Sequence, residues 1–322
     1  MTAKTEEITF SFGENWIDYL STINEERIKS ATADIEDWIG ADSIRGKRII
    51  DVGSGSGLSS LCLYKLHPAE LVSFDYDPKS VEATKAIKEK FGGKEDWRIL
   101  HGSALDPSFL SGLGEFDIVY SWGVLHHTGE MWSAIDNAQR LCKSGGLTLI
   151  SIYEAGDLYP EHLALKQKYN SASDEEKNEI IKAEVAQKYP DLPFETAVRE
   201  MQGACKERGM NHYNDLIDWL GGLPYEVAYP SEVLERFMRA GFLPLRVLEW
   251  SQGGCSIYLF KKTGAPYNAL KNAPFKWEHL THLGRVETRT YNKQLADERG
   301  QILYLDGFLP KISIKSLRAR IG

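Results

Sequence analysis

Short apolar runs alternate with helix-favouring stretches through the middle of the chain. Strands are predicted for the apolar runs at residues 48–53, 70–75, 97–101, 116–121 and 146–153. Such alternation is typical of a parallel sheet with helices on both faces. A predicted helix at 231–240 precedes two further strands, 244–250 and 255–261, and the Gly253-Gly254 pair between them favours a hairpin turn. The pattern therefore predicts an α/β fold whose seven-stranded, mostly parallel sheet ends in an antiparallel strand.

The predicted parts are an N-terminal helical lid (1–45), a core (46–153 and 230–262), a helical cap (154–229) and a C-terminal extension (263–322). In the N-terminal part, Trp16 and its aromatic neighbours either cap the edge of the sheet or cover a ligand. The cap is helix-favouring, broken by prolines, and too rich in aromatic residues for disorder. In the extension, alternating stretches at 285–291 and 301–306 suggest a β-hairpin.

A glycine-rich turn follows the first predicted strand. Gly53, Gly55 and Gly57 stand at every second position, and a helix-compatible stretch begins at Leu58. Glycines let the backbone approach a ligand closely, and a helix N-terminus offers unpaired N–H groups. The second strand ends in Asp75, whose carboxylate can accept both hydroxyls of a ribose.

The neighbours of this turn narrow the choice of nucleotide. Leu58 stands where a dinucleotide-binding turn would have its third glycine, and the chain has no Gly-Lys-Ser/Thr sequence of a P-loop. From Asp51 to Tyr64 no basic residue occurs. A ligand with a ribose and no phosphate fits this loop best, although an acid after the second strand suits NAD as well.

From about residue 46 to 153 the chain resembles the class I S-adenosylmethionine-dependent methyltransferases, which are Rossmann-like. The motifs that carry the resemblance are Asp51-Val-Gly-Ser-Gly-Ser-Gly57, Val72-Ser-Phe-Asp75-Tyr-Asp-Pro78, His101-Gly-Ser-Ala-Leu-Asp106, the fourth-strand motif Phe116 to His127, and Leu141-Cys-Lys-Ser-Gly-Gly146. Their order and spacing match the family over about a third of the chain. The cofactor implied is S-adenosyl-L-methionine, with S-adenosyl-L-homocysteine as product.

The resemblance also implies roles for single residues. The positions implied to bind the cofactor are Asp51, Gly53, Ser54, Gly55, Asp75, Tyr76, Ser103, Ala104, Ser121, Trp122 and Gly123. Asp75 would bind the ribose hydroxyls and Tyr76 would flank the adenine. Ser103 and Ala104 would contact the adenine edge, where the family often has an acid in place of Ser103. Ser121, Trp122 and Gly123 would line the methyl-donor end.

Methyl transfer to a hydroxyl needs alignment, exclusion of water and a base that removes the proton. Histidine suits that task near neutral pH, and His126, His127 and His212 are the candidates. The alternative for His126 and His127 is packing beside the cofactor without a chemical role, and Tyr213 is comparable to His212. No metal ligand is expected, because Trp122 and Gly123 stand where catechol-type enzymes have a metal-binding acid.

The cap is predicted to determine the substrate. Aromatic residues expected to contact the substrate are Trp16, Tyr213, Trp219 and Tyr225. Asp215, Asp218 and Glu226 are expected to orient a base or bind a polar substrate, with at least one of them capping a helix instead.

Composition limits the partners. The 322 residues include 38 Lys and Arg against 46 Asp and Glu, so the net charge of −8 does not favour nucleic acid. The four cysteines form no CxxC pair and are expected to be free thiols. The N-terminus does not read as a signal peptide and no apolar run is long enough to span a bilayer, so a cytoplasmic location is expected. The basic C-terminus is a solvated face, a homodimer contact or a contact to an anionic substrate.

These observations favour a metal-independent methyltransferase that acts on a hydroxyl of a small molecule or glycan. Methylation of nitrogen or carbon, including a tRNA-modifying activity, remains open on sequence grounds. A non-catalytic S-adenosylmethionine-binding protein and an NAD-dependent oxidoreductase are the alternatives outside this class.

Overall fold

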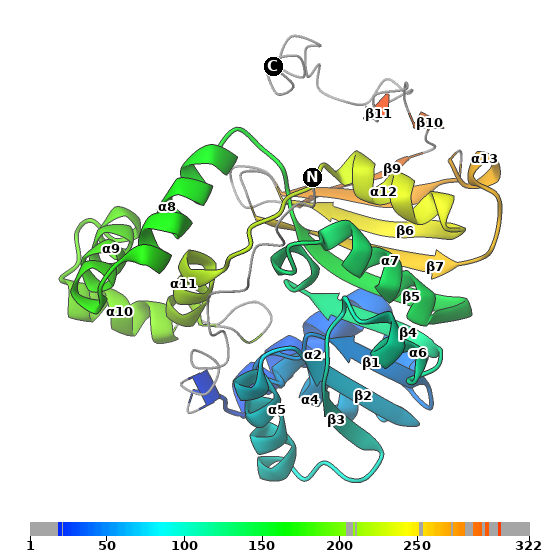
Figure 1. The fold of residues 1–322 in the computed structure, drawn as a ribbon, viewed down its shortest axis with the longest axis horizontal. Helices are drawn as coiled ribbons and strands as arrows, with labels where there is room; N and C mark the ends of the chain where they lie inside the picture. The colour runs from blue at the N-terminus through cyan, green and yellow to red at the C-terminus, as the bar shows by residue number, and fades with distance from the viewer. Residues whose placement is uncertain are drawn as a thin grey trace.

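The computed structural model describes residues 19–20, 22–203, 209, 211–250, 254–271, 273–280, 286–291, 294–295 and 302–303. Within these residues nine strands form one sheet in the order β3-β2-β1-β4-β5-β7-β6-β8-β9 (Figure 1). The strands are β1 (Arg48–Val52), β2 (Glu70–Asp75), β3 (Trp97–His101), β4 (Phe116–Trp122), β5 (Cys142–Tyr153), β6 (Phe242–Glu249), β7 (Cys255–Lys262), β8 (Phe275–Leu280) and β9 (Val286–Tyr291).

Strands β1 to β5 run parallel to one another, and β7 runs antiparallel to both β5 and β6. The predicted α/β fold is therefore confirmed, with the seven predicted strands in place and the seventh antiparallel. Two further strands extend the sheet, because β8 pairs in parallel with β6 and β9 pairs antiparallel with β8. The strand order changes direction between β1 and β4: β2 and β3 lie on one side of β1, and β4 and β5 lie on the other. Sheets of this kind bind ligands in the crevice at such a switch point.

The C-terminal hairpin differs in its partners from the prediction. The stretch expected at 285–291 corresponds to β9, which pairs antiparallel with β8. A short pair, β10 (Gln294–Leu295) with β11 (Ile302–Leu303), stands apart from the main sheet. Strand β8 alternates apolar and polar residues, and Phe275 and Trp277 are buried against the sheet's core. The burial of these two rings accounts for a strand that sequence analysis overlooked.

Helices cover both faces of the sheet. They are α2 (Glu25–Ile39), α3 (Ala41–Ile44), α4 (Leu58–Lys65), α5 (Pro78–Lys90), α6 (Pro107–Ser111), α7 (Met131–Leu141), α12 (Pro230–Arg239) and α13 (Tyr267–Leu270). Adjacent residues of β1 show the two layers: Ile49 packs with α2 and α4, and Ile50 packs with α7 and α12. Both side chains are fully buried, which explains why the strand reads as a continuous apolar run.

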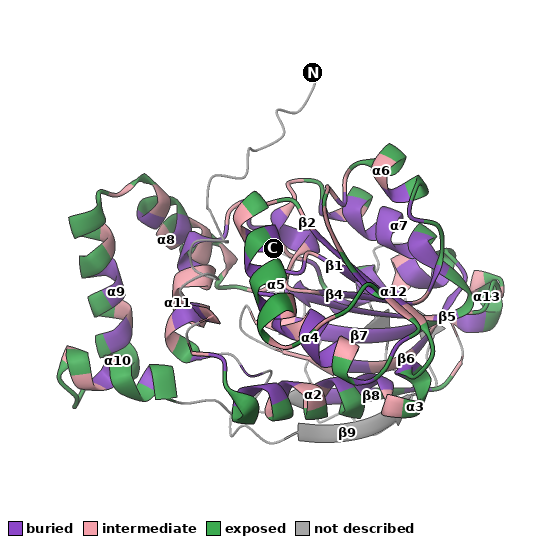
Figure 2. Ribbon diagram, turned by 90° about the horizontal axis from the view of Figure 1, so that it is seen from below, coloured by how far each residue is buried: buried purple, intermediate pink, exposed green. Residues whose placement is uncertain are grey.

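A helical insertion follows β5 and stands to one side of the sheet (Figures 1 and 2). It consists of α8 (Tyr159–Ser171), α9 (Asp174–Lys188), α10 (Phe194–Gly203) and α11 (His212–Gly221). The insertion has an apolar cluster of its own, which includes Tyr169, Ile181, Val185 and Leu220. Helix α9 begins with a capping box of Ser173 and Glu176, as its sequence favours.

Among the helices that the structure describes, none has the length and apolar character needed to cross a membrane.

Candidate active site

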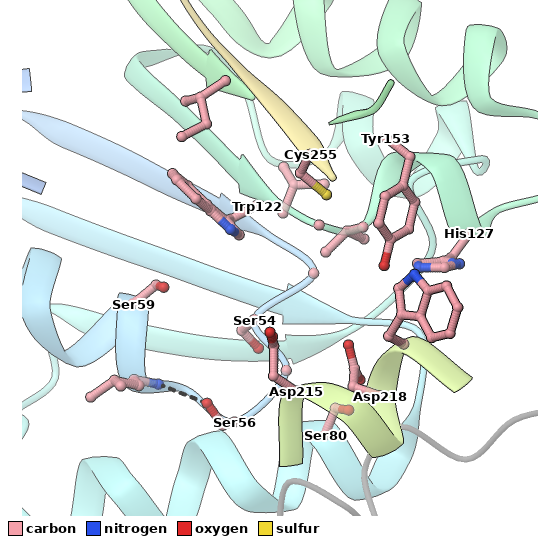
Figure 3. A pocket seen from close by; sticks show the side chains of 18 of the residues that line it. Ser54, Ser56, Ser59, Ser80, Trp122, His127, Tyr153, Asp215, Asp218 and Cys255 are labelled. Atoms are coloured by element: carbon pink, nitrogen blue, oxygen red, sulfur yellow. Dashed lines mark hydrogen bonds between the residues drawn. The ribbon is translucent and has the colours of Figure 1, made fainter. Parts of the chain in front are cut away.

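A cavity of about 1360 Å³ lies at the carboxyl ends of the central strands. One wall is the turn after β1, and the opposite wall is the helical insertion, chiefly α11 (Figure 3). Parallel strands end at the same edge of a sheet, so residues far apart in sequence converge there. The cavity is larger than many single-ligand pockets, which are about 300–1,000 Å³.

The glycine turn leaves room only for backbone. Gly53 has φ 78°, and a Cβ there would overlap the side chain of Val124. Gly57, the N-cap of α4, has φ 80°, and a Cβ there would lie 2.8 Å from Cα of Thr84. Both positions therefore require glycine, and the peptide groups between them can approach a ligand without a side chain intervening.

Asp75 lies at the centre of this wall. Its Oδ2 accepts from the N–H of Gly55 at 2.9 Å, and its Oδ1 accepts from the N–H of Asp77 at 2.9 Å. Burial raises the pKa of Asp75 to about 6, against the lowering effect of these two N–H donors. A carboxylate has further lone pairs, so Asp75 can also accept two hydroxyl groups, as a ribose would supply. The carboxylate and the glycine turn thus fit the nucleoside part of S-adenosylmethionine.

Asp51 lines the cavity from the end of β1. Its Oδ2 accepts from the hydroxyl of Ser60 at 2.5 Å, and that hydroxyl lies 2.8 Å from the hydroxyl of Ser73. Burial raises the pKa of Asp51 to about 7, with Asp75 adding a smaller repulsion and Ser60 opposing it. Asp51 is therefore partly protonated near neutral pH. A cation nearby would lower its pKa and favour the charged carboxylate.

The residues expected around an adenine lie farther along the same wall. Tyr76 is 58% exposed, and its carbonyl oxygen lies 2.8 Å from Nε2 of His101. Ser103 and Ala104 line the cavity, as do Trp122 and Gly123 near its middle. Ser121 differs: its hydroxyl donates to the carbonyl of Val52 at 2.9 Å, so it joins β4 to β1 and does not line the cavity.

The two adjacent histidines lie in a short 3₁₀ helix (Leu125–His127) and have different surroundings. His126 is buried within the protein, and its Nδ1 accepts from the N–H of Tyr153 at 3.2 Å. His127 lines the cavity, and its Nδ1 lies 2.7 Å from the carbonyl oxygen of Pro224. Because a carbonyl only accepts, this contact places the hydrogen on Nδ1 and the lone pair on Nε2. Burial lowers the pKa of both rings, that of His127 to about 3, with the Lys166 ammonium adding to the effect.

Three further aromatic residues were predicted to contact a substrate within the described part of the chain, and one does line the cavity. Trp219 stands on α11 facing it, while Tyr213 packs into the apolar cluster of the insertion. Tyr225 is buried behind Tyr153, with ring centroids 5.1 Å apart. Trp16 lies outside the described residues. His212, the first residue of α11, lines the cavity.

Sequence analysis missed two residues: Tyr153, which lines the cavity, and Lys166, which does not line it but contacts the lining residue Trp219. Tyr153 ends β5, and its hydroxyl points into the cavity (Figure 3). Burial holds its pKa well above the usual value, so the hydroxyl stays protonated. Lys166 of α8 is fully buried, donates to the carbonyl of Trp219, and lies over the ring of Trp219 at 4.5 Å. The position of Tyr153 at a strand's carboxyl end was a usable signal, whereas Lys166 reads as a surface residue.

Acidic residues predominate along the cavity. The carboxyl groups among its described lining residues are those of Asp34, Asp37, Asp51, Asp75, Asp77, Glu184, Asp215 and Asp218. Among the described lining residues, Lys188 and Arg246 have cationic side chains. Arg246 already pairs with Asp37 at 2.8 Å and with Glu278 at 2.5 Å. Glu226 does not line the cavity; it accepts from the N–H of Met131 at 3.0 Å and so caps α7.

Thiols and metal ligands add little to this site. Cys62 and Cys142 are buried, Cys255 points into the cavity, and none of the three is in a disulfide (Figure 3). Cys205 lies outside the described residues. Among the described residues, no group of three or more His, Cys, Asp or Glu side chains is arranged to hold a metal ion.

Comparison with known proteins finds a similarity that covers most of the core segment from 46 to 153. Residues 50–150 match the family described as a methyltransferase domain. The chain is 34% identical over 116 residues to a ubiquinone biosynthesis O-methyltransferase of Dechloromonas aromatica, covering 36% of this chain and 48% of that protein. It is 28% identical over 144 residues to the O-methyltransferase rstn1 of Aspergillus nomiae, covering 44% of this chain and 63% of that protein. The chain thus spans less than two thirds of either relative.

Among solved structures, the magnesium protoporphyrin IX methyltransferase of Synechocystis with bound S-adenosylhomocysteine is 15% identical. The alignment covers 74% of this chain and 88% of that chain, with a TM-score of 0.44.

Proposed function

We propose that the chain transfers a methyl group from S-adenosylmethionine to a hydroxyl of a small molecule or glycan, and the match of residues 50–150 to the methyltransferase domain family supports this. One observation carries the proposal. A single cavity joins the glycine turn and Asp75, which fit a nucleoside, to His127, Tyr153 and Trp219, which face a space for an acceptor. The two relatives described above, both O-methyltransferases by name, support oxygen as the atom that is methylated.

S-adenosylmethionine supplies an electrophilic methyl group on a sulfonium. The residues of this chain bind and orient the two reactants. Asp75 accepts the ribose hydroxyls, and the peptide groups at Gly53 and Gly55 lie along the methionine portion of the cofactor. Trp122 and Trp219 exclude water from opposite walls of the cavity. The acceptor then lies between the turn after β1 and helix α11.

His127 is the proposed base. Its neutral ring has the lone pair on Nε2, because Nδ1 donates to the carbonyl of Pro224. The acceptor's O–H bond breaks, Nε2 takes the proton, and the oxygen forms a bond to the methyl carbon as the carbon–sulfur bond breaks. Burial makes His127 a weak base in the free protein. The histidine is therefore proposed to take the proton as the sulfonium loses its charge, so that the total charge of the pocket is unchanged.

The N-terminal part and the helical insertion are proposed as the lid and the cap of this site. Tyr19 and Arg27 both donate to the carbonyl of Gly209, which lies between α10 and α11, so these two residues tie Gly209 to the N-terminal part. Arg27 is buried and also donates to the carbonyl of Gln202. These contacts support joint positioning of α2 and α11 over the cofactor.

The proposal is tested by titration and by transfer. Calorimetric titration is expected to show binding of S-adenosylhomocysteine and no binding of NAD. Incubation with host extract and S-adenosylmethionine labelled in the methyl group is expected to yield a labelled small molecule or glycan with an O-methyl group by mass spectrometry. The Asp75→Ala protein is the matched control for labelling. Label on nitrogen, on RNA or on nothing would contradict the proposal.

A further inference from the structure

We propose that Lys166 is a positioning residue for the base: its buried ammonium fastens the C-terminal end of α11, and that end of the helix holds the ring of His127. This inference rests on the proposed function, because it concerns the histidine that is proposed to take the proton. Lys166 lies on α8 and does not line the cavity. Its effect on the reaction is therefore indirect, through the segment that follows α11.

The ammonium of Lys166 has one carbonyl partner and three aromatic neighbours among the described residues. It donates to the carbonyl of Trp219. It also lies 4.5 Å from the ring centroid of Trp219, 4.6 Å from that of Tyr225 and 5.7 Å from that of Tyr153. Aromatic faces attract a cation most strongly where water is excluded, and Lys166 is fully buried. The ammonium thus links α8 to the last turn of α11, to the segment after it and to the end of β5.

The carbonyls that α8 reaches lie at the end of α11, where a helix lacks partners for them. Helix α11 ends in Trp219, Leu220 and Gly221. Nδ2 of Asn170, one turn beyond Lys166 on α8, lies 3.0 Å from the carbonyl oxygen of Gly221 and 3.4 Å from that of Leu220. This end of a helix is also the negative end of its dipole, so a cation there is stabilising. One face of α8 therefore fixes the end of α11.

The segment that follows α11 holds the ring of His127 at two edges. Gly222 is buried beside the ring, and a Cβ at this position would lie 2.6 Å from Cε1 and 3.1 Å from Nε2. The carbonyl oxygen of Pro224 lies 2.7 Å from Nδ1. The N–H of Glu226 donates to the carbonyl of His126 at 3.0 Å, which fixes the same segment to the 3₁₀ helix. The position of the ring therefore depends on where α11 ends.

The charge of Lys166 also affects the protonation of the base. Burial lowers the pKa of His127 to about 3, and the ammonium of Lys166 adds to this effect. Burial lowers the pKa of Lys166 itself to about 7, while Asp218 and Cys255 oppose the change. At pH 6 the amine is therefore mostly charged and the histidine is neutral. The ring contact to Pro224 and the cation–aromatic contacts of Lys166 are both expected at this pH.

Nitrogen-15 NMR of the histidine rings tests the inference on the full chain at pH 6. It distinguishes a ring nitrogen that has a hydrogen from one that does not, and the signals absent from His127→Asn are those of His127. A neutral imidazole released from the Pro224 carbonyl can have its hydrogen on either nitrogen. The wild type is expected to have it on Nδ1. In Lys166→Met, which keeps a long unbranched side chain without the charge, the ratio of the Nδ1–H to the Nε2–H form is expected to fall about tenfold.

Further variants separate the end of α11 from the rest of the insertion. Gly222→Ala is expected to lower the same ratio, because its Cβ would overlap the ring. Asn170→Ala is expected to give a smaller change in the same direction, and it tests the helix end if Lys166→Met does not fold. Lys168→Met removes a charge from an exposed position of α8, and Gly156→Ala adds a methyl group where nothing lies within 4 Å. Both of these controls are expected to keep the wild-type ratio.

The rate of methyl transfer separates positioning from binding. With host extract and labelled S-adenosylmethionine, Lys166→Met is expected to lower the rate at saturating cofactor about tenfold and to leave the KM for the cofactor within about twofold. The inference is overturned by an unchanged His127 ratio in Lys166→Met, or in Asn170→Ala if the former does not fold. An equal change in Lys168→Met, or a changed ratio with an unchanged rate, also overturns it. A wild type that yields no labelled product would instead count against the proposed function.

Discussion

The Nδ1 atom of His127 lies 2.7 Å from the carbonyl oxygen of Pro224, a residue that leads from α11 back toward the sheet. The helical insertion therefore determines which nitrogen of the proposed base has the lone pair. Neighbouring His126 has no such role at the cavity, because its Nδ1 accepts from the backbone of Tyr153. The proposed base and a histidine whose Nδ1 accepts from the backbone thus stand side by side in the chain.

Two substitutions of His127 distinguish the roles of its ring nitrogens, Nδ1 and Nε2. In His127→Ala both nitrogens are lost, and turnover is expected to fall by about 10²-fold or more, the usual contribution of a general base. His127→Asn can still donate to the Pro224 carbonyl but has no atom in place of Nε2. If His127 is the base, the Asn variant is as slow as the Ala variant, with the affinity for S-adenosylhomocysteine nearly unchanged. Recovery of activity in the Asn variant would assign His127 a positioning role and direct attention to His212.

Removing the carboxylate of Asp75 is expected to weaken cofactor binding strongly while the protein stays folded. Two hydrogen bonds from ribose hydroxyls to a carboxylate predict a loss of about 100-fold in the affinity for S-adenosylhomocysteine in Asp75→Ala. Calorimetric titration measures the loss, and circular dichroism of the same sample checks the fold. An affinity within threefold of the wild type, on the order of 0.6 kcal/mol, would remove Asp75 from the nucleoside site.

Cofactor binding should also depend on pH through Asp75. The pKa of this carboxyl is raised to about 6 in the free protein, so the charged form that accepts ribose hydroxyls is lost as the pH falls through 6. The affinity for S-adenosylhomocysteine is therefore expected to weaken by about tenfold for each unit below pH 6, and to level off above pH 7. The Asp75→Asn variant should lack this component. Identical pH profiles for wild type and variant would show that another group controls binding.

Asp51 makes a separate prediction for stability. Its pKa is raised to about 7 in the folded protein, above the value of 3.8 in the unfolded chain. Between these values the folded state binds a proton that the unfolded state does not, so the free energy of unfolding decreases as the pH rises from 4 to 7. Asp51→Asn should lose this decrease and gain about 2 kcal/mol relative to wild type on going from pH 5 to pH 8. Urea unfolding of both proteins without cofactor measures the difference, and parallel curves would contradict the raised pKa.

Two glycines test the fit of the cradle. Gly53 and Gly46 both have positive φ, 78° and 69°, but a Cβ at Gly46 meets nothing within 4 Å, whereas one at Gly53 overlaps Val124. Gly46→Ala is expected to cost only backbone strain, about 1 kcal/mol. Gly53→Ala adds steric overlap of about 1–3 kcal/mol and should also impair cofactor binding. Thermal unfolding and titration of the two variants compare them, and equal losses would show that the cradle does not depend on Val124.

The local pattern of residues determined the elements and the nucleoside half of the site. Each strand from β1 to β7 contains a short apolar run, which can be recognised without knowing the strand it pairs with. The glycines and Asp75 stand at the ends of such runs. Strand β8 was missed because its burial depends on pairing with β6, which is distant in the sequence. A hydrophobic period reports which residues prefer burial, and it does not report which strand they will join.

The residues of the proposed acceptor half are brought together by tertiary structure alone. Nothing in the sequence distinguishes His126 from His127, and only the direction of the 3₁₀ turn places one ring in the core and the other at the cavity. Lys166 is buried because α8 packs against α11, which brings the ring of Trp219 over its ammonium. Side-chain direction at these positions results from packing between distant segments. Lys166 and Trp219, for example, are more than 50 residues apart in the sequence. Local propensity carries no information about such contacts.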